Sequence, residues 1–516
     1  MTLNTEVDLN RALDADQDQD QDLNLAHWRR LRQGLTVDAR LFVDGRRDRA
    51  LTEDVFESRE PCGQVLVATF PACGPADVDR AVASARRSFD GGAWSRQQPA
   101  SRAAVLCQFA ALMRRHSDEL ALLDTVEMGM PIADSKAAVL EAADSLRQVA
   151  ELATQLHTTI VPSAASAVVT NQRAPHGVVA AITAWNFPLS LAMSKIGPAL
   201  AVGNSLVLKP SELAGLSSLR LADLAVEAGV PAGVLNVLPG RGHEAGESLA
   251  LHDDVDMLSF TGSTAVGMRL MQCAGRSNLK SLALECGGKS PQIVLDDTGN
   301  LAALAEQLVQ GFTWNAGQLC VAGTRILVAA ALERPLIDAM AEHLSRLQVG
   351  DSLDPATRIG PLVSGDHHRR VTSMVDSAIR QGATELGRCM TSLHAPFLGP
   401  VLLGCNDIAA DINQQEVFGP VATVMSFDSL EQAVALANGT RYGLYATVWS
   451  ADAALVNQIG PRLRAGAVVL NSTTAAMPSE AALASSEPFG VSGFGAEGGW
   501  AGLLAYTRAR SVTWNR

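Results

Sequence analysis

Short apolar runs alternate with amphipathic segments along most of the chain. Several amphipathic segments carry apolar residues at helical spacing, and they predict helices over 76–89, 101–116, 136–155, 190–201 and 215–228. The short, nearly continuous apolar runs predict strands over 178–184, 205–209, 234–237, 257–260 and 291–295. Strands that are apolar throughout are typical of a parallel sheet with helices on both faces.

The second half of the chain repeats this alternation. It predicts helices over 302–315, 332–347, 366–381 and 430–437, and strands over 324–329, 421–426, 446–449 and 467–471. The whole pattern predicts two consecutive α/β domains, and the sequence contains no short internal repeat.

The N-terminal segment differs from the rest in composition. Residues 14–22 read DADQDQDQD, a low-complexity acidic tract with no apolar surface to bury. We therefore expect residues 1–40 to form a disordered acidic tail, and residues 1–24 lack the apolar core of a secretory signal. The folded sequence is expected to begin near Leu41, where LFVDGR has the pattern of a strand and a turn.

The composition is that of a large globular protein. Hydrophobic residues make up 47% and charged residues 18% of the 516 residues, which suits a large core and, as a rough prior, about three domains. Asp and Glu number 54 against 41 Lys and Arg, and the resulting formal charge of −13 argues against a nucleic-acid partner. No apolar stretch reaches the length of a membrane span, so no membrane partner is expected.

The eight cysteines are scattered, at positions 62, 73, 107, 273, 286, 320, 389 and 405. They form neither a CxxC pair nor a cysteine–histidine cluster with zinc spacing, so we expect no metal site. Eight cysteines in so long a chain do not make a disulfide framework, and they predict reduced thiols in a cytoplasmic protein.

Three polar residues lie where predicted elements end. Cys320 closes FTWNAGQLC, in which Asn, Gly and Gln interrupt an apolar helix and leave the thiol on a loop; a lone cysteine is more often a buried packing residue. Glu285 in LALECGGKSP ends an apolar strand. Its carboxylate is either a general base or an ordinary surface group. Asn186 in TAWNFPLS either caps the next helix or donates to an oxyanion.

Three further stretches have the chemistry of nucleotide binding. Glycines in 238–246 and 260–267 precede or open helices, whose N-termini suit pyrophosphate, although neither stretch matches the strict GxGxxG fingerprint. Lys209 and Glu212 follow another predicted strand. They are expected either to hold the hydroxyls of an adenosine ribose or to form a helix cap.

Eight motifs follow one another in an order that one known family shares. They are AWNFP at 184–188, KPSE at 209–212, FTGSTAVG at 260–267, LECGGKSP at 284–291, GQLC at 317–320, EVFGP at 416–420, YGL at 442–444 and PFG at 488–490. From about residue 41 to residue 514 the sequence resembles the aldehyde dehydrogenase superfamily, NAD(P)-dependent enzymes that oxidise aldehydes to carboxylates.

The resemblance implies an aldehyde dehydrogenase-like α/β fold with two Rossmann-type domains and a small β extension for oligomerisation. The implied boundaries are 41–155 and 174–287 for the dinucleotide-binding domain, 288–487 for the catalytic domain, and 156–173 and 488–516 for the extension. The active site is expected in the cleft between the two large domains. A homodimer or homotetramer is implied.

The resemblance also assigns roles to single residues. Cys320 resembles the nucleophile, Glu285 the general base, and Asn186 with the backbone N–H of Cys320 the oxyanion hole. Lys195 and Glu497 match positions linked to proton relay. The implied cofactor contacts are Ile182, Trp185, Lys209, Glu212, Gly242, Gly262, Ser263, Gly267, Glu416 and Phe418.

Cofactor and substrate preferences follow from the same positions. Glu212 favours NAD, because a carboxylate accepts from the ribose 2′-hydroxyl and repels a 2′-phosphate, although Lys209 and Ser211 remain compatible with NADP. Ser194 stands where many relatives carry a bulky aromatic residue. The implied tunnel is mostly apolar: Phe187, Leu191, Ser194, Trp314, Leu319, Val321 and Phe489. We expect a medium or large apolar aldehyde, aliphatic, aromatic or terpenoid; the alternative is a promiscuous enzyme.

Two other functions remain open. A CoA-acylating dehydrogenase of the same superfamily would transfer the acyl group to CoA, but such enzymes often lack the general base that Glu285 resembles. A non-catalytic binding or structural relative would be free to lose Cys320, Glu285 and Asn186, yet all three are present.

Four positions depart from the family pattern. Cys286 stands for the usual Leu, MGMP at 128–131 replaces the commoner Gly-Lys-Pro, and Ala496 replaces an Arg. The segment after Gly490 is shortened and lacks the usual Lys. These changes affect a loop near the substrate entrance and the subunit contacts, not the three residues matched to catalytic roles.

Overall fold

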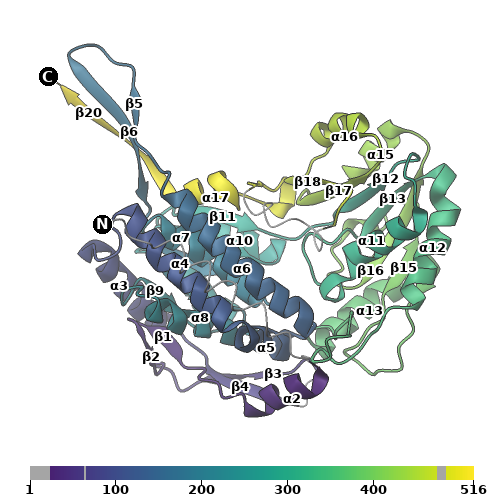
Figure 1. Ribbon diagram of the computed structural model, residues 1–516, viewed down its shortest axis with the longest axis horizontal. Helices are drawn as coiled ribbons and strands as arrows, with labels where there is room; N and C mark the ends of the chain where they lie inside the picture. The colour runs from purple at the N-terminus through teal and green to yellow at the C-terminus, as the bar shows by residue number, and fades with distance from the viewer. Residues whose placement is uncertain (1–23, 63–64, 474–483, 516) are drawn as a thin grey trace, which may run out of the picture.

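The computed structural model describes residues 24–62, 65–473 and 484–515. Two α/β halves lie side by side, and a β arm projects from the first half (Figure 1). Both halves contain a mostly parallel sheet, so the predicted α/β class is confirmed. No helix in the described ranges is long and apolar enough to cross a membrane.

The first sheet has eight strands in the order β19-β11-β10-β7-β8-β9-β1-β2. They are β1 (Leu41–Val43), β2 (Arg46–Asp48), β7 (Val178–Ile182), β8 (Ser205–Lys209), β9 (Leu235–Val237), β10 (Met257–Thr261), β11 (Ser281–Glu285) and β19 (Gly493–Phe494). The strands from β11 to β9 are parallel, while β1, β2 and β19 run antiparallel to their neighbours. The buried residues of β7 alternate between two apolar cores, one on each face of the sheet.

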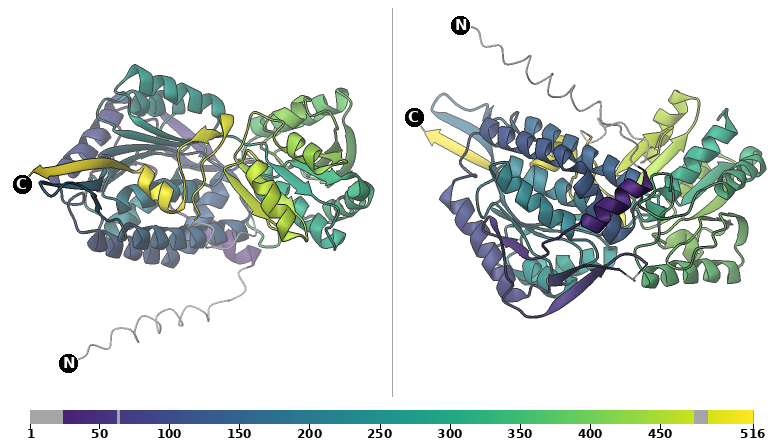
Figure 2. Two further views of the ribbon diagram at one scale, coloured as in Figure 1. Left: turned by 90° about the horizontal axis from the view of Figure 1, so that it is seen from above. Right: turned by 60° about the horizontal axis from the view of Figure 1, so that its bottom comes forward.

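Helices cover both faces of this sheet (Figure 2). One face carries α4 (Pro99–Arg115), α5 (Ser117–Met128), α6 (Ile132–Ala153), α7 (Pro188–Ala201) and α8 (Leu216–Glu227). The other carries α3 (Pro75–Gly91), the short π-helix η1 (Gly242–Gly246), α9 (Glu247–Leu251) and α10 (Thr264–Arg276). A separate hairpin, β3 (Val55–Arg59) and β4 (Leu66–Pro71), packs against the first face through Phe56 and Phe70.

The second sheet has seven strands in the order β14-β15-β16-β13-β12-β17-β18. They are β12 (Pro291–Val294), β13 (Arg325–Ala329), β14 (Thr384–Arg388), β15 (Val401–Gly404), β16 (Val421–Phe427), β17 (Tyr445–Trp449) and β18 (Ala467–Leu470). Only β14 runs antiparallel to its neighbour. The accompanying helices are α11 (Leu301–Thr313), α12 (Glu333–Ser345), α13 (Gly365–Arg380), α14 (Asp411–Gln414), α15 (Leu430–Ala437) and α16 (Ala453–Ile459).

The arm is a three-stranded sheet of β5 (Thr159–Val161), β6 (Ala167–Pro175) and β20 (Thr507–Asn515). Strand β20 pairs with β6 along its whole length, so parts of both segments assigned to the predicted extension, 156–173 and 488–516, lie in one sheet. The predicted boundary at 488 is wrong in part, because β19 pairs with β11 in the first sheet. Gly493 permits this: its φ is +123°, and a side chain there would overlap the carbonyl oxygen of Leu284.

Helix α5 has no counterpart in the sequence pattern. Helix α5 buries nine consecutive residues, from Leu120 to Met128. A helix that is buried all round has no polar face, so it lacks the periodicity that predicts helices from sequence. Strands β14 and β15 were likewise not predicted, whereas the predicted helices and central strands occur with bounds shifted by a few residues.

The predicted disorder of residues 1–40 is wrong for residues 25–34, which form α2 (Leu25–Gly34). Asn24 caps this helix by accepting from the N–H of His27 at 3.1 Å. Trp28 is only 2% exposed and joins the first core, and Arg32 pairs with Glu60 at 2.8 Å. One buried indole therefore holds the helix on the domain; the acidic tract 14–22 lies outside the described residues.

Replacing Trp28 with Ala should destabilise the protein by about 3 kcal/mol, because it removes a large buried side chain. Urea denaturation followed by circular dichroism measures the effect. Arg30→Ala on the exposed side of the same helix is the matched control and should leave the unfolding midpoint unchanged. Equal midpoints for the two variants would contradict the docking of α2.

Candidate active site

A cavity of about 840 Å³ lies where the two α/β halves meet. Its walls come from α6, α7, the ends of β10 and β11, the loop after α11, the start of α13 and the segment that leads into β20. Cys320, Glu285 and Asn186 all line it. The structure therefore brings the three residues matched to catalytic roles into one space.

The loop before Cys320 has an unusual backbone. Helix α11 ends at Thr313, and Asn315, Ala316 and Gly317 follow with φ of 48°, 54° and 69°. Non-glycine residues rarely adopt positive φ, so the surrounding contacts must hold this conformation. Gln318 supplies two of them: its amide donates to the carbonyl of Asn315 at 3.1 Å and accepts from the N–H of Val363 at 2.9 Å.

Asn186 is locked to the same loop by reciprocal amide contacts. Its side-chain Nδ2 donates to the backbone carbonyl of Gln318 at 2.9 Å, and the backbone carbonyl of Asn186 accepts from Nδ2 of Asn315 at 2.8 Å. An amide nitrogen carries two hydrogens, so one remains beyond the bond to Gln318. Asn186 and the Cys320 loop are consequently positioned as one unit.

The turn Gly287–Gly288 connects the first sheet to the second and passes directly under Cys320. A side chain at Gly288 would overlap the carbonyl oxygen of Cys320. The N–H of Gly288 donates to Glu416 Oε1 at 2.9 Å, and a Cβ at Gly287 would lie 2.5 Å from Glu416 Oε2. Only glycine at these two positions permits so close an approach.

Burial and neighbouring carboxylates keep protons on the site. Burial and the charge of Glu497 raise the pKa of Glu285 to about 8, although the charge of Lys195 acts to lower it. Burial and the charges of Glu416, Glu285 and Glu497 raise the pKa of the Cys320 thiol to about 12. Burial also raises the pKa of Glu416 to about 7. A thiolate on Cys320 therefore needs a proton acceptor close by.

The two residues matched to proton relay form an ion pair beside Glu285. Nζ of Lys195, on α7, lies 2.6 Å from Glu497 Oε2, and Lys195 is 2% exposed. Burial lowers the pKa of Lys195, but the charges of Glu497, Tyr506 and Glu285 raise it to about 12. The pair thus places one buried positive charge next to the candidate base.

The predicted cofactor residues divide into two groups. Trp185, Gly262, Ser263, Glu416 and Phe418 line the cavity. The others lie outside its lining: Ile182, Lys209, Glu212, Gly242 and Gly267. They lie at or just after the carboxyl ends of β7 and β8 and in the first turns of η1 and α10. Open α/β sheets bind nucleotides at this edge.

The chemistry of the outer group fits a dinucleotide. Lys209 is buried, and its Nζ donates to the carbonyl of Pro210 at 2.6 Å and to Glu212 Oε2 at 3.4 Å, which leaves a cation and a carboxylate together for ribose hydroxyls. Ser263 caps the exposed N-terminus of α10, a place that suits pyrophosphate. Gly267 has a packing role, because a Cβ there would lie 2.7 Å from Sγ of the buried Cys286.

Sequence reasoning missed His367 and Arg370 on α13, which line the cavity beside Phe418. His367 Nε2 donates to the carbonyl of Phe418 at 2.7 Å, and burial lowers the pKa of His367 to about 4, so its ring is neutral. Phe418 has a φ of 56°, and its ring meets Trp185 edge-on at 5.4 Å. No motif marks these α13 residues; only the fold brings them here.

Most of the predicted substrate residues line the cavity near Cys320. Phe187, Leu191, Ser194, Trp314, Leu319 and Val321 do so, and the rings of Phe187 and Trp314 lie 5.2 Å apart. Phe489 does not belong to the lining: it is 46% exposed, and its N–H donates to the carbonyl of Gly443 at 2.8 Å. One face of α6, with small residues at 138, 142 and 145, supplies a wall that was not predicted.

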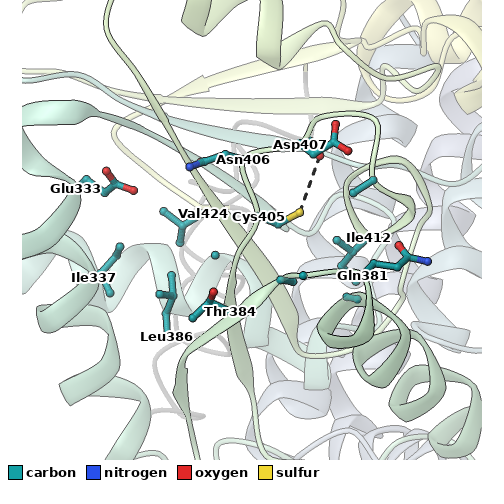
Figure 3. A pocket seen from close by; sticks show the side chains of 15 residues that line it. Glu333, Ile337, Gln381, Thr384, Leu386, Cys405, Asn406, Asp407, Ile412 and Val424 are labelled. Carbon is teal, nitrogen blue, oxygen red and sulfur yellow. Dashed lines mark hydrogen bonds between the residues drawn. The ribbon is translucent and has the colours of Figure 1, made fainter.

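A second cavity of about 450 Å³ lies at the β14–β15 edge of the second sheet (Figure 3). Cys405 points into it, and its Sγ donates to the carbonyl of Asp407 at 3.9 Å. None of the motif residues lines this cavity. Within the described ranges, no group of three or more His, Cys, Asp or Glu is arranged to hold a metal.

Known proteins share this architecture. The model of the aldehyde dehydrogenase family matches residues 48–512. The chain is 40% identical to the NADP/NAD-dependent aldehyde dehydrogenase PuuC of Escherichia coli, over 87% of this chain and 90% of PuuC. It is also 40% identical to the aminoacetaldehyde dehydrogenase of Pseudomonas aeruginosa, over 85% of this chain and 88% of that protein.

Two solved structures agree closely with the fold. The indole-3-acetaldehyde dehydrogenase AldA of P. syringae, in complex with NAD⁺ and IAA, superposes with a TM-score of 0.93 at 39% identity and covers 96% of this chain and 100% of its own. The aldehyde dehydrogenase KauB of Pseudomonas aeruginosa has the same TM-score of 0.93 at 38% identity, with 96% and 100% covered.

Gly288→Ala should abolish aldehyde-dependent reduction of NAD, because the added methyl would displace the backbone of Cys320. The rate is read as absorbance of NADH, and the melting temperature shows whether the variant is folded. Gly299→Ala is the matched control, since a Cβ there meets nothing within 4 Å. A folded Gly288→Ala variant with the activity of the control would disprove the tight contact.

Proposed function

The chain belongs to the aldehyde dehydrogenase family and is an NAD(P)-dependent oxidoreductase of aldehydes, and we propose that it forms a carboxylic acid through a thioester on Cys320. The substrate is a medium or large apolar aldehyde. The observation that carries this proposal is the common cavity, in which the thiol, the buried carboxyl of Glu285 and the amide of Asn186 meet beside an aromatic wall.

The first step is addition of Cys320 Sγ to the aldehyde carbon. The thiol proton passes to the carboxylate of Glu285, since a pKa near 12 leaves almost no free thiolate at neutral pH. The carbonyl oxygen becomes an oxyanion, and the remaining Nδ2 hydrogen of Asn186 and the N–H of Cys320 donate to it. Loss of one such donor typically costs about 3 kcal/mol of transition-state stabilisation.

NAD, when bound, accepts a hydride from the carbon attached to Cys320. Lys209, Glu212 and Ser263 would hold the adenosine ribose and the pyrophosphate. Glu416 and Phe418 would orient the nicotinamide ribose, and both are fixed, the first by the N–H of Gly288 and the second by His367. Glu212 favours NAD over NADP, while Lys209 and Ser211 are compatible with either.

Hydrolysis of the thioester uses the same base again. Glu285 first passes the thiol proton to the adjacent carboxylate of Glu497, which pairs with Lys195. Glu285 then accepts a proton from water, and the resulting hydroxide equivalent attacks the acyl carbon. The C–S bond breaks, and the departing thiolate of Cys320 takes its proton back from Glu285. Because the pKa of Glu285 is about 8, the fraction of carboxylate, and with it the rate of hydrolysis, rises as the pH increases through 8.

The choice of an apolar aldehyde rests on the walls of the cavity. Phe187 and Trp314 form an aromatic surface near Cys320, and Ser194 leaves room where a bulky ring would narrow the tunnel. The AldA relative is an indole-3-acetaldehyde dehydrogenase, an enzyme for an aldehyde with an aromatic body. An aliphatic, aromatic or terpenoid body would bury apolar surface in the same space.

We also propose that the β arm pairs subunits into a homodimer or homotetramer. In the single chain, the large apolar side chains of Ile160 and Trp514 on the arm are 76% and 51% exposed. Burial of this apolar surface against a second subunit would be favourable. The residues 488–516, except for β19, and 156–173 would then serve as the oligomerisation extension. All eight cysteines are free thiols, which supports the cytoplasmic location proposed from the sequence.

The proposed function is tested by NADH formation with a panel of short, long, aromatic and terpenoid aldehydes, without CoA. We expect kcat/KM to increase with the apolar surface of the aldehyde, and Cys320→Ala to lose all activity. Cys405→Ala, at the other cavity, is the control and should keep it.

Three outcomes would contradict the proposal. A steady preference for small charged aldehydes would refute the apolar substrate. Turnover only after addition of CoA would identify the acylating alternative, and no turnover with any aldehyde, with or without CoA, would favour a non-catalytic relative.

A further inference from the structure

The aromatic wall of the cavity is assembled from both halves of the protein. Phe187 stands just before α7 in the first half, and Trp314 follows α11 in the second. Both residues line the cavity, and their rings lie 5.2 Å apart at an angle of 58°. The shape of the wall therefore depends on contacts that cross from one half to the other.

The backbone of Trp314 is fixed by its own half. Its N–H donates to the carbonyl of Gln310 in the last turn of α11, and the chain turns directly afterwards, where Asn315 has a φ of 48°. The indole leaves the chain at this break. Its orientation is set by side chains of the first half, of which Phe187 is one.

The second contact to the indole is a carboxylate. Asp134, in the first turn of α6, accepts a hydrogen bond from the indole N–H of Trp314. The ring of Trp314 lines the cavity, whereas the half-buried Asp134 does not belong to the lining. Trp314 thus presents its apolar ring to the cavity and its polar N–H to Asp134.

The place of Asp134 on α6 suggests a second, simpler role. A carboxylate in the first turn of a helix is favourable because it lies near the positive end of the helix dipole. That role depends on the negative charge, whereas the hydrogen bond from Trp314 depends on an acceptor atom. Asn keeps the acceptor and loses the charge, so it distinguishes the two roles.

We propose that Asp134 is a positioning residue that holds the N–H of Trp314 away from the substrate and thereby sets the preference of the tunnel for a bulky apolar body. This inference rests on the proposed function and explains how its apolar wall is maintained. Without an acceptor at position 134, the indole N–H binds water in the cavity. A bulky aldehyde expels this water and leaves the N–H unpaired, which is unfavourable for a buried donor.

The test compares 3-phenylpropanal with propanal, which share a three-carbon aldehyde and differ by a phenyl ring. Asp134→Ala should lower kcat/KM for 3-phenylpropanal about tenfold, as expected for a buried donor without an acceptor, and leave propanal unchanged. The loss should appear in KM, with kcat retained, because the phenyl ring lies away from the reacting carbon. Asp134→Asn should restore the preference, because its Oδ1 still accepts.

Three further variants serve as controls. Asp144→Ala is the matched change on the same helix, where Asp144 pairs with Arg114, and it should keep the wild-type preference. Asp134→Leu fills the space of the carboxylate without an acceptor, and it replaces Asp134→Ala if the melting temperature shows that Asp134→Ala is unfolded. In Trp314→Phe protein, which has no N–H at this position, Asp134→Ala should have no further effect on either aldehyde.

An unchanged preference in Asp134→Ala, or an equal loss for both aldehydes, would overturn the inference. A loss in Asp134→Asn as large as that in Asp134→Ala would leave Asp134 a helix-terminal charge and would also overturn it. So would a full effect of Asp134→Ala in the Trp314→Phe protein.

A binding measurement separates this inference from the proposed function. Titration calorimetry with 3-phenylpropan-1-ol in the presence of NAD requires no turnover. Binding about tenfold weaker in Asp134→Ala and restored in Asp134→Asn would support the inference even if neither aldehyde were oxidised, in which case the proposed function alone would fail. Equal Kd values in wild-type and Asp134→Ala protein, or no binding to the wild-type protein, would overturn the inference.

Discussion

The site depends on one close approach of backbone: Gly287 and Gly288 pass between Cys320 and Glu416 with no room for a side chain. These two glycines also connect β11 of the first sheet to β12 of the second. The end of β11 carries Glu285, and the second half supplies the loop of Cys320. The same turn that joins the two sheets therefore brings the candidate base and the candidate nucleophile into one cavity.

The turn is held from several sides. Ser492 donates from its hydroxyl to the carbonyl of Gly287 at 2.7 Å, and its own carbonyl accepts from the N–H of Cys286 at 2.8 Å. Strand β19 then continues along β11, so the shortened segment after Gly490 is part of the support of the site. The missing Lys of that segment leaves these contacts intact.

Charge is the second constraint on the site. Two carboxyl groups, those of Glu285 and Glu416, and the thiol of Cys320 share a space from which water is partly excluded, and burial raises the pKa of each. Lys195 is the buried positive charge among them. The chemistry that this arrangement favours is a sequence of proton transfers in which Glu285 first accepts a proton from sulfur and later from water.

Much of the site could be predicted from the sequence because its residues lie at the ends of regular elements. An apolar strand that ends in Glu285 and a helix interrupted before Cys320 are visible as patterns, and the order of the motifs then indicated the family. The positive φ of Asn315 and Ala316 was not predictable. Contacts to Asn186, which is distant in the sequence, and to the nearby Gln318 hold this conformation. His367 reaches the site through the fold alone.

The same limit explains the errors outside the site. Helix α5 has no polar face, so no periodicity marks it. Helix α2 is held by a single buried Trp28 in a segment whose composition is dominated by charge, and composition predicted disorder there. In both cases tertiary burial decided the structure, and burial of this kind is not encoded in local pattern.

The central claim is that Cys320 carries the acyl group and Glu285 releases it. The most direct measurement is the intact mass of Glu285→Gln protein quenched during turnover with NAD and an apolar aldehyde. The account predicts an added mass equal to the acyl group and about one equivalent of NADH, both formed slowly because Gln cannot accept the thiol proton, with no further turnover, and loss of both in the Glu285→Gln, Cys320→Ala double variant. An unmodified mass with normal turnover, or an adduct that persists without Cys320, would contradict it.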